Sequence, residues 1–281
     1  MKFVITGVTG YIGSHVARAA KKMFPSIRIV GYARNIKSTE ASDFEIRNID
    51  VISERGINDI VSIMDSDDIL IHCAWENGFN HSSDKHLSNL YGHYRLLDNL
   101  AKAGVQNINV LGTMHEIGYA EGKVSEDIYC QPVNKYGIAK NTLRQLLFNV
   151  VPQKNNYLKW LRLFYITGDD KNNQSVFTKL IEAAERGDKT FPVVEGNNYL
   201  DFIDVEEIAR RIILISAQRR ITGVINVCSG EPVKFCDYII KFINDNKLNI
   251  KPIFGAYPSR EGESPCIYGD TEKQKRAMTA E

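Results

Sequence analysis

The sequence predicts an α/β fold in which helices cover both faces of a doubly wound parallel sheet. Short apolar runs of strand length alternate along the chain with longer segments of helical pattern. A glycine-rich turn joins the first apolar run to the first of these helices. With 281 residues, the chain is long enough for one large domain or for a domain with a smaller lobe.

Composition and charge exclude several classes of protein. The chain is 43% hydrophobic and 25% charged, and its net charge is +1 without a long run of one sign. A dedicated nucleic-acid-binding or membrane-surface protein is therefore not expected. The five cysteines are scattered without metal-ligand spacing, which indicates reduced thiols in a cytoplasmic protein and no metal site. No apolar run reaches the length of a signal peptide or a transmembrane helix.

The first apolar run ends in a turn with glycines at a regular spacing. Gly7 permits the tight turn, Gly10 allows the backbone to approach a pyrophosphate, and Gly13 allows the helix to pack close to the strand. The helix N-terminus then presents N–H groups to the phosphates. We therefore expect this turn, with Tyr11 and Ile12, to bind a dinucleotide. The alternative is a turn with a structural role alone.

The second strand, residues 27–33, ends at Ala33 and is followed by Arg34. This position commonly holds an acid that hydrogen-bonds the ribose 2′-hydroxyl of NAD, whereas a nearby arginine accommodates the 2′-phosphate of NADP. The sequence therefore favours NADP(H) over NAD(H). If Arg34 is instead a solvated charge at a strand end, it carries no such preference.

Two further strands end in residues expected at the cofactor. The third strand ends at residues 48–51, where Asp50, beside Val51, can accept a hydrogen bond from the adenine amino group. The alternative role for Asp50 is that of an acid in a turn. The next strand ends in the small residues Cys73 and Ala74, which let the chain pass close to the cofactor.

The chemistry is predicted to lie on two later elements. A strand over residues 108–111 leads to Thr113, at the sheet edge where ligands bind and a hydroxyl can hydrogen-bond a substrate carbonyl. A helix over residues 136–150 places Tyr136 and Lys140 on one face, one turn apart. The ammonium group then lowers the pKa of the phenol, which can donate and accept a proton for a carbonyl/alcohol pair. Without the other motifs, a surface pair would be the better interpretation.

The order of these motifs resembles the extended short-chain dehydrogenase/reductase family, in its nucleotide-sugar branch. The resemblance rests on Gly7, Gly10 and Gly13, on Thr113 five residues before Gly118, on Tyr136 with Lys140, and on segments 162–168, 201–205 and 223–230. It implies a Rossmann-type sheet with a small C-terminal substrate-binding lobe. The NAD(P)-binding domain is expected at residues 1–165 and 201–231, and the lobe at residues 166–200 and 232–281.

The resemblance also implies roles for individual residues. Tyr136 would exchange a proton with the sugar oxygen, and Thr113 would orient that oxygen. Lys140 would lower the pKa of Tyr136 and hydrogen-bond the nicotinamide ribose. The nicotinamide would give or take a hydride at the same carbon. Phe164 is expected to contact the nicotinamide, and Tyr165 to contact the substrate.

Within that family, two positions favour a reductase. The dehydratase branch has Asp-Glu directly after the threonine, and this chain has Met114 and His115. Epimerases that hold NAD tightly commonly carry an acid at the end of the second strand, and this chain has Ala33 and Arg34. The sequence is similar to NADPH-dependent reductases of nucleotide-linked 4-keto-6-deoxyhexoses, with dTDP favoured over GDP or CDP. Such enzymes make deoxysugars for surface polysaccharides, including the O-antigen of lipopolysaccharide.

Two departures from the family pattern concern substrate binding. Many relatives carry an arginine for the nucleotide phosphates directly before Asp201, and this chain has Leu200. Lys179 and Arg260 are the candidate replacements. His115 stands where an epimerising reductase has a cysteine, so we expect it to contact the substrate. Reduction coupled to 3,5-epimerisation is the alternative role for this histidine.

Three other functions are alternatives to the ketosugar reductase: a 4-epimerase with tightly bound NAD, a non-catalytic NADP(H)-binding sensor, and a reductase of small carbonyl compounds. The set of Thr113, Tyr136 and Lys140 argues against a sensor, because a sensor needs no proton donor beside the nicotinamide. The helices predicted at residues 84–103 and 136–150 resemble the family's dimer interface, a four-helix bundle. A homodimer is therefore expected.

Overall fold

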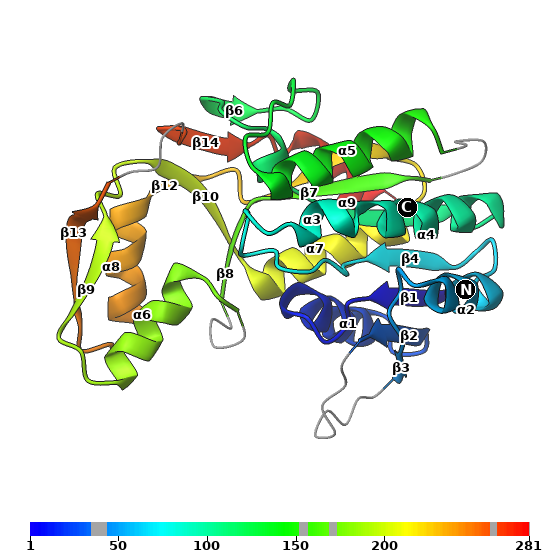
Figure 1. The fold of residues 1–281 in the computed structure, drawn as a ribbon, viewed down its shortest axis with the longest axis horizontal. Coiled ribbons are helices and arrows are strands. Elements are labelled where there is room, and N and C mark those ends of the chain that lie inside the picture. The colour runs from blue at the N-terminus through cyan, green and yellow to red at the C-terminus, as the bar shows by residue number, and fades with distance from the viewer. Residues whose placement is uncertain (35–43, 152–156, 169–172, 259–262, 281) are drawn as a thin grey trace.

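The computed structural model describes residues 1–34, 44–151, 157–168, 173–258 and 263–280, and Arg260 lies outside these ranges. Within them, the centre of the molecule is a seven-stranded sheet in which neighbouring strands are parallel (Figure 1). In sheet order the strands are β11 (Gly223–Val227), β7 (Lys159–Leu163), β5 (Asn107–Thr113), β4 (Ile69–His72), β1 (Lys2–Thr6), β2 (Arg28–Ala33) and β3 (Glu45–Asn48). The predicted Rossmann-type fold is confirmed.

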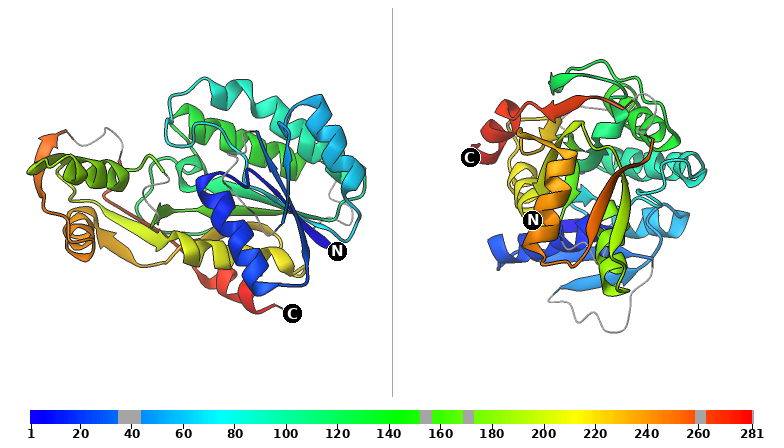
Figure 2. Two further views of the ribbon diagram at one scale, coloured as in Figure 1. Left: turned by 90° about the horizontal axis from the view of Figure 1, so that it is seen from below. Right: turned by 90° about the vertical axis from the view of Figure 1, so that its left-hand side faces the viewer.

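Helices cover both faces of this sheet, as the left view of Figure 2 shows. One face packs against α1 (Tyr11–Met23), α7 (Val205–Ala217) and α9 (Glu272–Thr279), and the other against α2 (Glu54–Ile63), α4 (Leu90–Lys102) and α5 (Lys135–Asn149). Because both faces are buried, the middle of β1 is apolar without alternation, and Phe3, Val4 and Ile5 are all 0% exposed. Among the described residues, no helix combines the length and apolar character needed to cross a membrane.

Side chains at the helix starts explain where several helices begin. The Ser53 hydroxyl accepts from the Gly56 N–H at 3.0 Å before α2, and the Asn134 side chain accepts from the Gly137 N–H at 2.8 Å before α5. Helix α1 differs, because Gly10 at its N-cap has no side chain to accept such a bond. The N–H groups of its first turn therefore face the end of the sheet without a side-chain cap.

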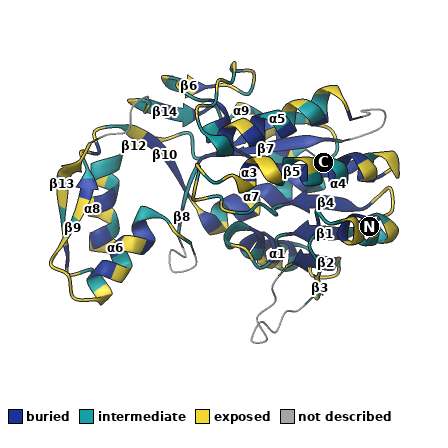
Figure 3. Cartoon of the chain, in the orientation of Figure 1, coloured by how far each residue is buried: buried dark blue, intermediate teal, exposed yellow. Residues whose placement is uncertain are grey.

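A smaller lobe extends to one side of the central sheet (Figure 1). Its described elements are β6 (Gly122–Val124), β8 (Tyr165–Thr167), α6 (Val176–Glu185), β9 (Thr190–Val194), β10 (Tyr199–Asp204), β12 (Pro232–Lys234), α8 (Phe235–Asp245), β13 (Lys251–Tyr257) and β14 (Cys266–Gly269). An aromatic core joins them, in which Phe202 stacks on Tyr238 at a centroid distance of 4.1 Å and Phe177 contacts both rings. Figure 3 shows that buried residues occupy the inner faces of α6 and α8.

Two segment boundaries differ from the sequence-based expectation. The helix expected at residues 84–103 is divided at Asn89 into α3 (Lys85–Ser88) and α4. The strand expected at residues 158–165 ends at Leu163, and β8 pairs with β10 in the lobe sheet instead. An apolar run predicts burial, but it does not show which of two sheets a strand joins.

The C-terminal helix returns to the central domain. The sequence assigns residues 232–281 to the lobe, yet α9 packs against α7 and β11, with Ala277 buried in the same apolar cluster as α1. Its Gln274 amide donates to the Cys228 carbonyl oxygen at 2.9 Å, at the end of β11. Ala277, Met278 and the Gln274 hydrogen bonds to Cys228 hold this helix, and these contacts have no strong sequence pattern.

Candidate active site

The glycine turn has the geometry expected of a phosphate-binding turn. Gly7 has a φ of +68°, and a Cβ there would lie 2.8 Å from the backbone of Ala74 on the neighbouring strand end. A Cβ at Gly13 would lie 2.1 Å from the Gly7 carbonyl oxygen, so α1 packs against the turn only because residue 13 has no side chain. The turn therefore leaves the start of α1 open to an anionic ligand.

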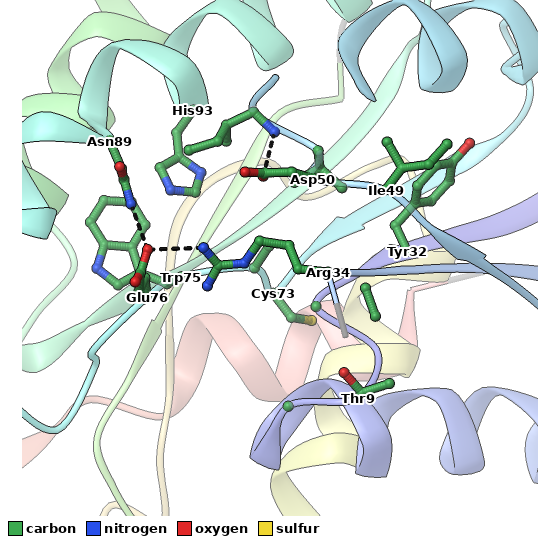
Figure 4. Close-up of a pocket in the computed structure, with 16 residues that line it drawn as sticks. Thr9, Tyr32, Arg34, Ile49, Asp50, Cys73, Trp75, Glu76, Asn89 and His93 are labelled. Carbon is green, nitrogen blue, oxygen red and sulfur yellow. Dashed lines mark hydrogen bonds and ion pairs between the residues drawn. The ribbon is translucent and has the colours of Figure 1, made fainter. Parts of the chain in front are cut away.

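A pocket opens beside this turn, at the carboxyl ends of β1, β2 and β4 (Figure 4). It is lined by Gly7, Thr9, Gly10, Tyr32, Ala33, Arg34, Ile49, Asp50, Val51, Ile52, Cys73, Ala74, Trp75, Glu76, Asn89 and His93. Order reverses in the sheet between β1 and β4, and ligands of open α/β sheets bind at that reversal. A bare glycine turn, a helix N-terminus and an apolar floor fit the diphosphate and adenosine of a dinucleotide.

Some of the residues predicted to contact the cofactor line this pocket, whereas Tyr11, Ile12 and Phe164 do not. Gly7, Gly10, Arg34, Asp50, Val51, Cys73 and Ala74 line the pocket. Tyr11 begins α1 and its hydroxyl donates to the Gly168 carbonyl oxygen at 2.5 Å, while Ile12 packs on the apolar cluster behind the sheet. Phe164 is 5% exposed and belongs to the lobe core, where it contacts Gly269.

The three predicted catalytic side chains converge at the end of β5. Thr113 is the last residue of β5, and its hydroxyl hydrogen-bonds the phenol of Tyr136 from the first turn of α5. Lys140 follows one turn later and is 3% exposed. Its ammonium donates to the Leu111 carbonyl oxygen at 2.8 Å and lies 3.9 Å from the centroid of the Trp75 ring.

The electrostatics of this group correct one expectation. Lys140 was expected to lower the pKa of Tyr136, but burial raises the pKa of Tyr136 to about 12, opposed by the hydrogen bond from Thr113. Burial also lowers the pKa of Lys140 to about 7, because desolvation opposes the charged ammonium. The reason is geometric: the ammonium is directed at Leu111 and Trp75. Tyr136 is therefore a protonated phenol across the physiological pH range.

Aromatic and imidazole rings surround Tyr136. His81 stacks on its ring at a centroid distance of 5.2 Å, and the centroids of His86, His115 and Trp75 lie 5.1, 6.0 and 6.3 Å away. The Tyr136 backbone N–H also donates to the His81 carbonyl oxygen at 3.1 Å. These contacts fix the plane of the phenol before any ligand binds, which is the preorganisation that acid–base catalysis needs.

His72 and His93 form a hydrogen-bonded pair, and His93 lines the pocket. His72 bridges the Thr6 hydroxyl at 2.8 Å and the His93 imidazole at 2.9 Å, and His93 stacks on Trp75 at 4.5 Å. Burial lowers the pKa of His72 to about 3, so this pair is neutral. Five of the six histidines in the chain thus gather around Trp75 and Tyr136, with His15 on α1 as the exception.

Residues expected at the substrate are only partly brought together. The His115 ring contacts Tyr136, and its centroid lies 6.2 Å from that of Tyr165 in an edge-on arrangement. Lys179 is exposed on α6 of the lobe. Leu200, which replaces the family's arginine, is 6% exposed in the lobe core. Among the described residues, no group of three or more His, Cys, Asp or Glu side chains could hold a metal ion.

A buried ion pair between Glu116 and Arg162 contacts the Thr113 backbone. Glu116, in the short helix η1 (Met114–Glu116), and Arg162 on β7 are both 0% exposed and approach to 2.7 Å. The same carboxylate accepts from the Trp160 indole N–H at 2.8 Å and from the Thr113 backbone N–H at 3.5 Å. The Arg162 guanidinium also donates to the Asn226 side chain at 3.2 Å. The loop after β5 is thereby tied to β7 and β11.

Sequence reasoning missed several residues of this site, including Trp75, Glu76, His81 and Glu116. The clustering of His72, His81, His86 and His93 within a short stretch was a usable signal, since histidine is rare in this chain. Glu116 and Arg162 are far apart in sequence and carry no local pattern that predicts their pairing.

Comparison with known proteins identifies the family of the chain. The model of the NAD dependent epimerase/dehydratase family matches residues 3–228. The chain belongs to this family. A dTDP-6-deoxy-L-talose 4-dehydrogenase (NAD(+)) of Aggregatibacter actinomycetemcomitans is 35% identical over 274 residues, covering 96% of this chain and 99% of that protein. A GDP-6-deoxy-D-talose 4-dehydrogenase of the same organism is 22% identical, covering 82% of this chain and 75% of that protein.

Solved structures share the fold at lower identity. A UDP-glucose-4-epimerase from Stenotrophomonas maltophila, with bound NAD and formylated UDP-arabinopyranose, superposes with a TM-score of 0.85 at 17% identity. It covers 100% of this chain, which covers 93% of it. MoeE5, solved with UDP-glucuronic acid and NAD, gives a TM-score of 0.82 at 22% identity, covering 99% of this chain and 92% of its own. These likenesses establish the fold.

Replacing Glu116 with Gln should destabilise the protein. The substitution leaves the buried Arg162 guanidinium without its counter-charge and turns an amide N–H group toward the Trp160 donor, which should cost about 3–5 kcal/mol of unfolding free energy. Urea denaturation measures this loss. Glu272→Gln, on the exposed face of α9, is the matched control and should change stability by less than about 0.5 kcal/mol. Equal stability of the two variants would contradict the role assigned to the ion pair.

Burial of Lys140 predicts a pH-dependent stability. Its pKa is about 7 in the folded protein against 10.5 for an unperturbed lysine, so the unfolded chain binds more protons between these values. The free energy of unfolding should therefore rise with pH across this window, and the cost of the buried charge is fully present below it. Lys140→Met removes this dependence.

The measurement is urea unfolding of both proteins from pH 7 to about pH 10. The stability of Lys140→Met relative to wild type should fall by a few kcal/mol over that range. Lys102→Met, at a lysine that is 62% exposed on α4, serves as the control and should not show this fall. A stability difference between Lys140→Met and wild type that does not vary with pH would contradict the assignment.

Proposed function

We propose that this protein is a nicotinamide-dependent oxidoreductase that interconverts the 4-keto and 4-hydroxy forms of a dTDP-linked 6-deoxyhexose, with reduction as the biosynthetic direction. The observation that carries the proposal is the convergence of Thr113, Tyr136 and Lys140 beside a pocket that fits a dinucleotide. A proton donor and a hydride source at one carbonyl group are what ketone reduction requires.

The residues of this chain supply the proton and the orientation. When bound, the nicotinamide ring supplies the hydride that adds to C4 of the ketose. Thr113 and Tyr136 hold the carbonyl oxygen between two hydroxyl groups. As the C–H bond forms at C4, the phenol O–H bond breaks and its proton passes to that oxygen. The pKa of Tyr136, raised to about 12, keeps the proton on the phenol until charge develops on the ketose oxygen. Lys140, one turn away, has its ammonium on the Leu111 carbonyl oxygen and over the Trp75 ring, so in this proposal it helps to shape the site and does not set the pKa of Tyr136.

The identity of the sugar rests on the relative from Aggregatibacter actinomycetemcomitans. Its name describes a 4-dehydrogenase of dTDP-6-deoxy-L-talose that uses NAD(+), and the two chains match over almost their entire lengths. This supports a dTDP-linked 6-deoxyhexose as substrate and C4 as the reacting carbon. A role in deoxysugar supply for surface polysaccharide stays a prediction from the sequence.

The cofactor is proposed to be NAD(H). The sequence-based preference for NADP(H) rested on Arg34, whose guanidinium donates to the Glu76 carboxylate at 2.9 Å. This pairing offsets the charge that a 2′-phosphate would require. The relative that names its cofactor names NAD(+), which supports the same assignment.

The substrate is proposed to lie between the Tyr136 site and the lobe. His115 contacts the Tyr136 ring and Tyr165 contacts His115, and these are the side chains that the sugar ring would meet. Lys179 on α6 is the described candidate for the diphosphate, in place of the arginine that Leu200 replaces. In this proposal His115 contacts the sugar, and coupled epimerisation is its alternative role.

The test is nicotinamide absorbance over time with freshly prepared dTDP-4-keto-6-deoxyglucose and its C3/C5 epimer, with GDP- and CDP-linked ketoses beside them. We expect NADH oxidation with a dTDP-linked ketose. Tyr136→Phe should lower kcat by about 10²–10⁴-fold, because it removes the proton donor while keeping the ring contacts.

The control for Tyr136→Phe is dinucleotide affinity, which should stay within a few-fold of wild type. A sugar product that forms without net oxidation of NADH, together with NAD retained on the purified protein, would replace the proposal with a 4-epimerase. Dinucleotide binding without turnover of any nucleotide sugar would favour the sensor.

We also propose a homodimer through α4 and α5, which pack side by side and expose Tyr91 (68%) and Ile138 (42%). Light scattering at micromolar concentration should give the dimer mass. Tyr91→Glu combined with Ile138→Glu should give a folded monomer, since charges on a shared apolar face oppose association. Tyr129→Glu, at an 81% exposed position outside these helices, should stay dimeric. A monomeric wild-type protein would contradict this proposal.

A further inference from the structure

Three side chains form a hydrogen-bonded chain across the dinucleotide pocket (Figure 4). The Arg34 guanidinium donates to Glu76 Oε2 at 2.9 Å, and the Asn89 side-chain amide donates to the same oxygen at 3.0 Å. Arg34 directly follows β2, Glu76 lies in the loop after β4, and Asn89 precedes α4. The carboxylate is thus held from two sides by residues that all line the pocket.

This arrangement places a carboxylate beside the guanidinium that the sequence alone shows. The Arg34 hydrogen bond lowers the pKa of Glu76, and the carboxylate is therefore ionised at neutral pH. The side chains of Arg34 and Glu76 are 49% and 26% exposed, so the pair faces the open side of the pocket. Its net charge is zero, because one guanidinium is matched by one carboxylate.

The end of the second strand is the position from which an acid meets the ribose 2′-hydroxyl in dinucleotide-binding folds. In this chain that strand ends in Ala33 and Arg34, with no acid. Glu76 comes from a different loop, 42 residues later in the chain, and its carboxylate meets the guanidinium of the residue that directly follows this strand. A carboxylate there accepts a hydrogen bond from a hydroxyl and repels a phosphate.

We infer that Glu76 is a specificity-determining residue that selects NAD(H) over NADP(H), with Arg34 and Asn89 holding its carboxylate toward the ribose. The inference rests on the proposed function and names the feature that sets its cofactor. The 2′-hydroxyl of NAD(H) donates to the carboxylate. A 2′-phosphate meets the repulsion of Glu76, and Arg34 can pair with that phosphate only by breaking its bond to Glu76.

The experiment measures dinucleotide binding without any sugar, so it does not depend on turnover. NADH and NADPH are titrated against the purified protein, and dissociation constants are taken from the change in nicotinamide fluorescence. Wild type should bind NADH at least about tenfold more tightly than NADPH. Glu76→Gln keeps the side-chain shape and an acceptor oxygen but removes the charge. It should tighten NADPH binding by about tenfold, the effect of one nearby like charge.

A second substitution tests whether the gain in NADPH affinity depends on Arg34. In the Glu76→Gln background Arg34 is released to bind the 2′-phosphate, so adding Arg34→Ala should abolish the gain for NADPH and leave NADH binding within a few-fold. Glu272→Gln makes the same charge change on α9, away from the pocket, and should leave both constants as in wild type. Urea denaturation of each variant confirms that binding is compared between folded proteins.

The outcomes are distinguishable. Preferential binding of NADPH by wild type would overturn the inference and leave the oxidoreductase proposal standing with the other cofactor. An unchanged NADH-to-NADPH ratio in Glu76→Gln would also overturn it. If wild type binds neither dinucleotide, both the inference and the proposed function fail.

Discussion

The buried pair of Glu116 and Arg162 is the interaction on which the active-site edge depends. Both side chains are 0% exposed, so neither charge has water to replace the other. The carboxylate holds the Thr113 loop and Trp160, and the guanidinium reaches Asn226 and the Ser125 carbonyl oxygen. One ion pair therefore fixes the ends of β5, β7 and β11 relative to each other.

Parallel topology then determines where chemistry can occur. The carboxyl ends of the parallel strands lie at one edge of the sheet, and the strand order reverses between β1 and β4, beside Gly7. The dinucleotide pocket and the Thr113–Tyr136 site therefore share that edge. Burial sets the protonation of the site: it raises the pKa of Tyr136 and lowers that of Lys140. The stack of His81 and the edge of Trp75 hold the phenol in place. These features together favour a proton donor for ketone reduction.

Local patterns predicted much of this molecule. The glycine turn, the apolar strands and the Tyr136–Lys140 spacing each depend on neighbours in sequence, and the structure has them in the expected elements. What failed depends on long-range pairing. The strand after Leu163 pairs with β10 in the lobe sheet, and α9 packs against α7. Tertiary contacts determine both placements, because the alternative packing surfaces have a similar apolar character. Likewise, the sequence showed Arg34 but not its pairing with Glu76, on which the proposed choice between NAD(H) and NADP(H) depends. The direction of Lys140 toward Leu111, which changes the pKa argument, was also not accessible from spacing.

The central claim is that a hydride passes between the dinucleotide and C4 of the sugar while Tyr136 provides the proton. The most direct test reduces a dTDP-4-keto-6-deoxyhexose with NADH that carries deuterium at the transferable position, and locates the label in the product by NMR. The account predicts one deuterium at C4 of the 6-deoxyhexose for each dinucleotide oxidised. A product without label at C4, or a changed sugar with no dinucleotide consumed, would contradict it.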